Sequence, residues 1–127
     1  MDDRNLVAVA EQAAATSRVH RSAIQGATVL FDNGKVFLGC RMEYQDSRLD
    51  QDAVSSALSA GRVEGAYRPH RVGVYSPVSE GLPQIPRDTL LRLQELAAPG
   101  LSFVLSSGSG KRVERSLEDL LQETAEA

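Results

Sequence analysis

Apolar and polar residues recur with two different periods along the chain, and each period predicts its own kind of element. Residues 6–18 ("LVAVAEQAAATSR") have helical spacing in an alanine-rich segment. Residues 27–31 ("ATVLF") and 35–42 ("KVFLGCRM") are strand-like and flank Asn33-Gly34. That pair is a strong two-residue hairpin signal, because both positions accept positive φ. We therefore expect a helix followed by a β-hairpin.

A second helix is predicted over residues 53–61 ("AVSSALSAG"), with Asp50 or Asp52 as its N-cap and Gly61 as its stop. Its apolar face is made of small residues, which are Ala53, Val54, Ala57 and Ala60. Small residues allow a helix to approach its neighbour closely, so this helix is expected to pack tightly against a sheet or another helix.

Strands and helices alternate in the second half of the chain. The predicted elements are a strand at 71–77, a helix within 86–100, a strand at 101–107, a turn leading into a short fifth strand at 108–113, and a helix at 116–125. Pro86 suits the first turn of its helix, and Pro99-Gly100 ends it. Ser116 with Asp119 resembles a capping box.

This order of elements predicts the fold class. A hairpin followed by strand–helix alternation indicates an α/β protein with a mixed sheet of about five strands and helices on both faces. We expect a three-layer α/β/α sandwich in a single domain spanning residues 1–127, a length that suits one domain.

Composition narrows the range of partners. The formal net charge is −3 and the pI is about 5.4, with no block of like charge. Nucleic acids and anionic membranes require a clustered cationic surface, so neither is expected as a partner. From the acidic start of the sequence we expect no secretory signal, and no apolar run is long enough to span a membrane. Cys40 is the only cysteine, which excludes an intrachain disulfide. A cytoplasmic protein is expected, and abundant Ala and Arg with little Lys suggest a bacterial source.

Three stretches in order resemble a known family. The stretch "QGATVLFDNGKVFLGCRMEY" is followed by "DAVSSALSAGR" and near the end by "VERSLEDLLQ". Their order and spacing are similar to those of the small homotetrameric cytidine deaminases, over nearly the whole chain. The resemblance implies the cytidine-deaminase-like sandwich and assembly through the motif helices. We therefore expect a homodimer or homotetramer, which the small-residue helix at 53–61 would suit.

The sequence departs from this family where the family binds zinc. Counting from Glu43, the first zinc-ligand position is Asp52, the catalytic Glu position is Val54, and the two cysteines of the family's "PCxxC" motif become Arg87 and Leu90. Valine cannot transfer a proton, and neither Arg nor Leu binds zinc. The remaining soft or imidazole ligands lie far apart in the sequence, outside the motif helices; these are Cys40, His20 and His70. We expect no metal cofactor and no catalytic residue of the deaminase type.

Four residues are candidates for ligand binding. Glu43 matches the family glutamate that hydrogen-bonds a nucleoside ribose, although a solvent-facing residue at a strand end is the alternative. Arg41 replaces the family asparagine and would favour an anionic ligand if the pocket is open. Asp52 and Arg87 are predicted to form a salt bridge that fills the vacated metal site. The alternative is that both are exposed, with Asp52 a simple helix cap.

The leading hypothesis for function is therefore a catalytically silent relative of the cytidine deaminases. Such a protein would bind a nucleoside-like or other small polar ligand, or act as a structural or regulatory subunit. Two alternatives remain open. One is a hydrolase that reuses the pocket with Asp52 or Glu43 as acid or base. The other is a divergent deaminase with an unforeseen metal site.

Overall fold

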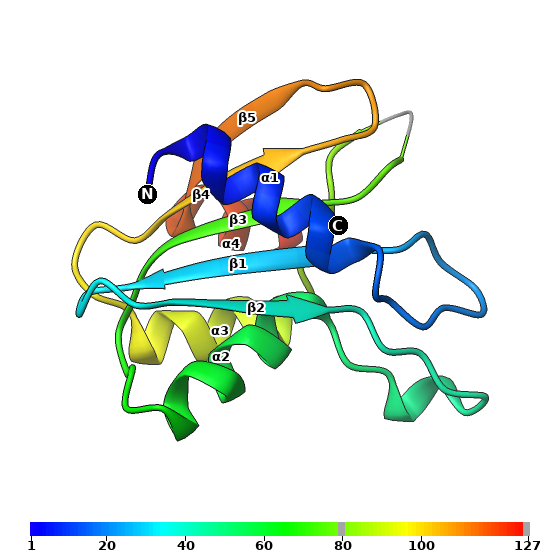
Figure 1. Cartoon of the computed structure of the whole chain (residues 1–127), viewed down its shortest axis with the longest axis horizontal. Coiled ribbons are helices and arrows are strands. Elements are labelled where there is room, and N and C mark those ends of the chain that lie inside the picture. Colours follow the sequence, from blue (N-terminus) through cyan, green and yellow to red (C-terminus); the bar gives the residue numbers. More distant parts are fainter. Residues whose placement is uncertain (79–80, 126–127) are drawn as a thin grey trace.

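The computed structural model of the chain describes residues 1–78 and 81–125. Figure 1 shows its helices and strands in chain order. They are α1 (Asp3–Ala14), β1 (Gly26–Phe31), β2 (Val36–Cys40), the short 3-10 helix η1 (Ser47–Leu49), α2 (Ala53–Val63), β3 (Pro69–Tyr75), α3 (Arg87–Leu96), β4 (Ser102–Ser106), β5 (Arg112–Ser116) and α4 (Leu117–Ala125). The predicted order of helices and strands is confirmed.

The strands form one sheet in the order β2-β1-β3-β4-β5. Strands β3 and β4 are parallel, and the other neighbouring pairs are antiparallel. The sheet is therefore mixed and five-stranded, as predicted. The parallel pair is made possible by α3, which lies between β3 and β4 in the sequence and carries the chain back across the sheet.

Helices cover both faces of the sheet, which gives three layers (Figure 1). Helix α1 covers one face, where Leu6 and Val7 pack against Val104. Helices α2, α3 and α4 cover the other face over the larger core, which includes Val29, Phe103 and further aliphatic residues of the sheet. The predicted α/β/α sandwich is confirmed.

The hairpin between β1 and β2 forms where predicted, but its turn differs in detail. Only Gly34 has positive φ, at 85°, whereas both central positions were expected to have it. The Gly34 N–H donates to the Phe31 carbonyl at 3.0 Å, and the Phe31 N–H donates to the Lys35 carbonyl at 3.0 Å. This pattern is a three-residue loop with glycine in the left-handed position, which also matches the twist of the strands.

Helix α2 lies unusually close to the sheet. A Cβ atom added to Gly39 of β2 would lie 2.0 Å from the carbonyl oxygen of Ala53 and 2.6 Å from the Ala57 nitrogen. Three of the predicted small residues of α2, Ala53, Val54 and Ala57, are fully buried inside the chain. The fourth, Ala60, is exposed, so its place on this face was predicted wrongly. The predicted close packing is confirmed, and the partner is the chain's own sheet.

The predicted stop of α2 at Gly61 is wrong. The helix continues to Val63, and Gly65, with φ of 84°, ends it in the usual left-handed conformation. Gly61 instead packs against an aromatic ring, since a Cβ there would lie 2.5 Å from Cζ of Phe31. Glycine at 61 thus serves packing inside the helix, which the sequence pattern alone does not distinguish from a stop.

Both bounds of α1 differ from the prediction of residues 6–18, whereas the cap of α4 forms as predicted. Helix α1 begins at Asp3, where the Asp2 carboxylate accepts from the Asn5 N–H at 2.8 Å, and it ends at Ala14. At α4, Ser116 and Asp119 exchange two hydrogen bonds of 3.2 and 3.0 Å, so the predicted capping box is confirmed. None of the helices described is long and apolar enough to cross a membrane.

Candidate functional site

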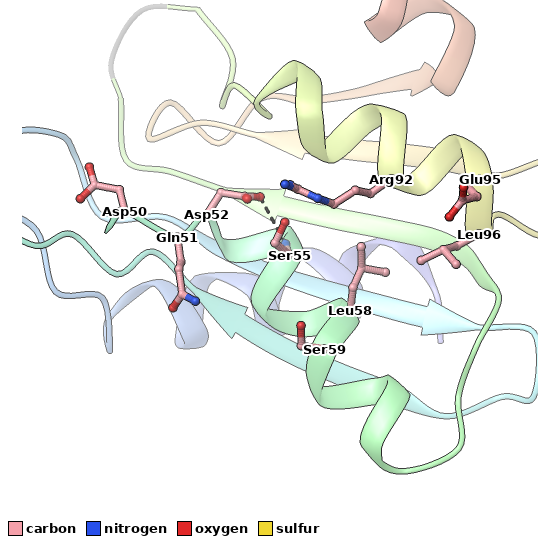
Figure 2. Close-up of a pocket in the computed structure, with 9 residues that line it drawn as sticks. All are labelled: Asp50, Gln51, Asp52, Ser55, Leu58, Ser59, Arg92, Glu95 and Leu96. Carbon is pink, nitrogen blue, oxygen red and sulfur yellow. Dashed lines mark hydrogen bonds between the residues drawn. The ribbon is translucent and has the colours of Figure 1, made fainter. Parts of the chain in front are cut away.

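The first turns of α2 and α3 meet through the buried carboxylate of Asp52. Its Oδ2 accepts from the Ser55 N–H at 3.3 Å and so caps α2, while its Oδ1 accepts from the Thr89 hydroxyl of α3 at 2.8 Å. Only 8% of Asp52 is exposed, and Thr89 is fully buried. Figure 2 shows Asp52 and Ser55 at the start of α2, facing α3. The chain thus joins the two helices with its own side chains.

The Thr89 hydroxyl has a single proton, which fixes the direction of the neighbouring hydrogen bonds. Because that proton goes to Asp52, the Ser55 hydroxyl, 3.0 Å from the Thr89 hydroxyl, must be the donor of that pair. Arg92 also donates to the Thr89 oxygen, at 3.3 Å. Ser55, Thr89 and Arg92 therefore form one continuous hydrogen-bond network that ends on the Asp52 carboxylate.

The predicted salt bridge between Asp52 and Arg87 is wrong. Arg87 is exposed, and its Nη1 donates to the Leu121 carbonyl at 2.9 Å and to the Thr124 hydroxyl at 3.0 Å, both in α4. Successive helical residues are rotated by about 100°, so residues two apart point to nearly opposite sides. Because Arg87 points to α4, Thr89 is the residue of α3 that reaches Asp52.

Arg92 and Asp52 lie in the wall of a pocket of about 460 Å³ between α2 and α3 (Figure 2). The charged residues in this wall are three carboxylates, Asp50, Asp52 and Glu95, and one cation, Arg92. The wall therefore has a formal charge of −2. We refer to this hollow as the interhelical pocket.

Glu43 lies inside the chain, with both carboxylate oxygens bonded to neighbouring groups. Its Oε1 accepts from the backbone N–H groups of His20 and Arg21 at 2.6 and 2.7 Å, and its Oε2 accepts from Nε of Arg41 at 2.8 Å. The side chain is fully buried, so the alternative of a solvent-facing residue is wrong. Burial by itself would raise the pKa of Glu43, but the hydrogen bonds from His20, Arg41 and Arg21 outweigh it and hold the pKa well below its usual range.

Arg41 separates Glu43 from a second pocket, of about 360 Å³. Polar groups in its wall come from Ser22, Gln25, Arg41, Ser76 and Gln84. The described residues that line it include no aspartate or glutamate. We call this hollow the Arg41 pocket. It shares no lining residue with the interhelical pocket, so the four predicted ligand-binding residues do not form one site.

The residues that the sequence resemblance places at a zinc position do not fit a zinc ion. Zinc sites in proteins combine Cys, His or carboxylate ligands around a tetrahedral centre. Here the meeting point of α2 and α3 offers one carboxylate with two hydroxyls, and Val54 and Leu90 are buried in the core. Within residues 1–78 and 81–125, no group of three or more His, Cys, Asp or Glu side chains could hold a metal ion.

The remaining candidate ligands for a metal are dispersed. Cys40 is half-buried in β2, while His20 and His70 are exposed in other parts of the chain. In the part of the chain that the structure describes, these three side chains therefore do not come together as a metal site.

Sequence reasoning missed Ser55, Thr89, Arg92 and Gln25. Ser55 and Thr89 both occupy the third position of their helices, following Asp52 and Pro86 at the cap positions. A hydroxyl at the third position of two facing helices is a signal that could have indicated their meeting. Gln25 precedes β1 in an irregular segment, and no sequence pattern marks it.

No protein-family model and no curated protein matches the chain. Solved structures do match it. The cytidine deaminase from Burkholderia pseudomallei superposes with a TM-score of 0.86 at 24% sequence identity, covering 94% of this chain and 96% of that one. The chain has the cytidine deaminase fold. The cytidine deaminase from Mycobacterium tuberculosis matches with a TM-score of 0.74 at 25% identity, covering 95% and 94% of the two chains. That from Mycobacterium leprae matches with 0.77 at 21% identity, covering 95% and 98%. These superpositions confirm the predicted cytidine-deaminase-like sandwich.

Proposed function

We propose that this chain is a zinc-free, non-deaminating protein of the cytidine deaminase fold that binds a small polar ligand. The observation that supports the proposal is the hydrogen-bond network of Asp52, Ser55 and Thr89 at the meeting point of α2 and α3. The network uses both carboxylate oxygens of Asp52 for contacts within the chain. The carboxylate is therefore engaged in holding the two helices together.

Hydrolytic deamination of a pyrimidine requires an activated water and a group that transfers protons to the base. The resemblance assigns the proton-transfer position to Val54, whose side chain lies wholly in the hydrophobic core. Glu43 does not replace it, because its oxygens accept from Arg41 and from the backbone of His20 and Arg21. Both oxygens of Asp52 and both oxygens of Glu43 therefore already accept hydrogen bonds from groups within the chain.

The test of this proposal is metal content together with cytidine turnover. The protein would be purified without chelator and without a nickel column, and zinc would be measured per chain beside an active cytidine deaminase purified in the same way. We expect no bound zinc and no loss of pyrimidine absorbance on incubation with cytidine. About one zinc per chain would overturn the proposal. Metal-free turnover that Asp52→Asn abolishes would replace it with a hydrolase in which Asp52 is acid or base.

Self-association is part of the proposal, although its expected surface has changed. Ala53, Val54 and Ala57 of α2 are buried against the sheet, so these three residues are not available to a second copy. Exposed apolar side chains lie elsewhere on the helical layer, with Val63 84% and Leu91 43% exposed. We expect a homodimer or homotetramer by light scattering at two protein concentrations. A monomer at both concentrations would remove this part of the proposal and leave the metal prediction unaffected.

A further inference from the structure

We infer that the Arg41 pocket selects small organic anions, with the Arg41 guanidinium as the group that contacts the anionic end of the ligand. The inference rests on the proposed function, in which the chain binds a small polar ligand without hydrolysing it. It goes further by naming the chemical class of the ligand and the pocket that takes it.

The arrangement of Arg41 and Glu43 presents the pocket with a cation. Glu43 is fully buried, whereas 23% of the Arg41 side chain is exposed and lines the pocket. The pair is neutral as a whole, but a ligand in the pocket meets the guanidinium first, since the carboxylate lies behind it. The interhelical pocket has the opposite character, because three carboxylates surround its single arginine.

The guanidinium retains donors for a ligand. Arginine has five N–H groups in a planar fork, which suits a carboxylate or a phosphate. Nε donates to Glu43 at 2.8 Å, and Nη2 makes only a long contact of 3.5 Å with the Ser22 hydroxyl. Nη1 makes no hydrogen bond to any residue that the structure describes. Glu43 thus orients the fork through Nε and leaves its outer edge toward the pocket.

Gln25 supplies a second, independent polar group in the same wall. It is only 6% exposed, and its Nε2 donates to the Gln84 carbonyl at 3.0 Å. That bond fixes the orientation of the Gln25 amide, because the flipped orientation would place Oε1 against the Gln84 carbonyl oxygen. Oε1 is then a buried acceptor without a donor among the described residues. A polar group buried this way is normally satisfied, so a ligand carrying an N–H or O–H beside its anionic group would complete the site.

Glu43 does not act as a ribose contact in this arrangement. A nucleoside would have to displace Arg41 or the backbone of His20 and Arg21 to reach its oxygens. The volume of about 360 Å³ lies within the usual range for small-molecule sites. The chemistry therefore favours an organic acid or a phosphate ester over a neutral nucleoside.

The experiment uses two pairs of probes that differ only in the anionic group, titrated calorimetrically into the full-length protein. The pairs are orotate with uracil and uridine 5′-monophosphate with uridine, and inorganic phosphate is added as a fifth probe. We expect at least one charged member to bind 10-fold or more tightly than its neutral partner, because hydrogen bonds to an ionised group are stronger than neutral ones. A 10-fold difference in affinity corresponds to about 1.4 kcal/mol. Orotate alone would assign a carboxylate ligand, and the nucleotide or free phosphate would assign a phosphate ligand. Equal affinity within both pairs, or no binding by any probe, would overturn the inference.

Variants then test whether Arg41 is the group responsible. Arg41→Gln should reduce the preference within the pair to less than about 3-fold, and Arg41→Lys should retain part of it. The matched control is Arg92→Gln in the interhelical pocket, which should leave the preference unchanged. Thermal unfolding checks that each variant is folded. If Arg41→Gln does not fold, the comparison of charged and neutral probes on the wild-type protein still tests the inference. Loss of the preference in Arg92→Gln would move the site to the other pocket and overturn the inference.

A finding of zinc or cytidine turnover would instead refute the proposed function, so the two failures are distinguishable.

Discussion

The hydroxyl of Thr89 lies 2.8 Å from Oδ1 of Asp52 and joins the third residue of α3 to the cap of α2. Replacing Thr89 by valine keeps the shape of the side chain but leaves a buried carboxylate oxygen without its donor. We expect the free energy of unfolding to fall by about 1–3 kcal/mol in urea titrations. Thr89→Ser should recover most of this loss. The control is Ser59→Ala on the exposed side of α2, which should change stability by less than about 0.5 kcal/mol.

Glu43 predicts a specific dependence of stability on pH. Its pKa is held below the usual value of 4.5, so the unfolded state binds more protons and stability falls as the pH falls. The contribution is complete above the unfolded pKa and is lost progressively below it. Glu43→Gln should be destabilised by roughly 2–4 kcal/mol at neutral pH, because the buried Arg41 contact and two backbone donors lose their charged acceptor.

The check for Glu43 is urea unfolding between pH 3 and 7 for the wild type and the variant. The difference in stability between them should shrink toward pH 3, since the variant has no proton to bind at this position. The matched control is Glu95→Gln, which alters an exposed carboxylate on α3 and should change stability at neutral pH by less than about 0.5 kcal/mol. A constant difference at every pH would contradict the internal, ionised Glu43 described above.

The position of Gly61 against the Phe31 ring predicts that a larger side chain at residue 61 would overpack the core. Alanine is favoured over glycine in a helix by about 1 kcal/mol, yet a Cβ at this position would lie 2.5 Å from the Phe31 ring. We expect Gly61→Ala to destabilise the protein by about 1–3 kcal/mol. Adding Phe31→Leu should make the effect of Gly61→Ala smaller in a double-mutant cycle. Strict additivity of the two changes would show that the ring does not limit this helix.

Arg71 of β3 joins α1 to the sheet through hydrogen bonds of its guanidinium. Its guanidinium donates to Asp3 at 2.7 Å, and also contacts Ser102 and, at 3.4 Å, Glu114. Asp3 is half-exposed, so Asp3→Asn should cost no more than about 1 kcal/mol and less at high salt. Arg71→Met should cost more, because it loses all three partners. The exposed pair Arg48 and Asp46 is the control, and Arg48→Met should have no measurable effect.

The sequence allowed prediction of the fold because each element had a local signal. The hairpin followed from Asn33-Gly34, α4 followed from the capping box of Ser116 and Asp119, and the mixed sheet followed from a hairpin succeeded by alternating strands and helices. The predicted end of α2 at Gly61 was wrong because the role of this residue is set by a ring 30 positions earlier in the chain. Local pattern cannot distinguish a glycine that ends a helix from one that accommodates a distant side chain.

The candidate site was less predictable because it depends on side-chain direction. Asp52 was correctly expected at the start of α2, but its partner was taken to be Arg87 on the ground of charge. The rotation of α3 turns Arg87 toward α4 and Thr89 toward Asp52, and that rotation is fixed by the burial of Leu90 and Leu93 in the core. Charge complementarity therefore gave the wrong residue, and geometry selected a neutral hydroxyl two positions away.

Strand β5 forms one outer edge of the sheet and pairs, among the described residues, with β4 alone. It carries Arg112, Glu114 and Arg115 over five residues. An additional strand at this edge would have to remove water from these charges before gaining backbone hydrogen bonds. The edge therefore resists the strand addition that leads to fibrils and domain-swapped aggregates. The strand that completes the sheet thus also protects this edge of it from pairing with another chain.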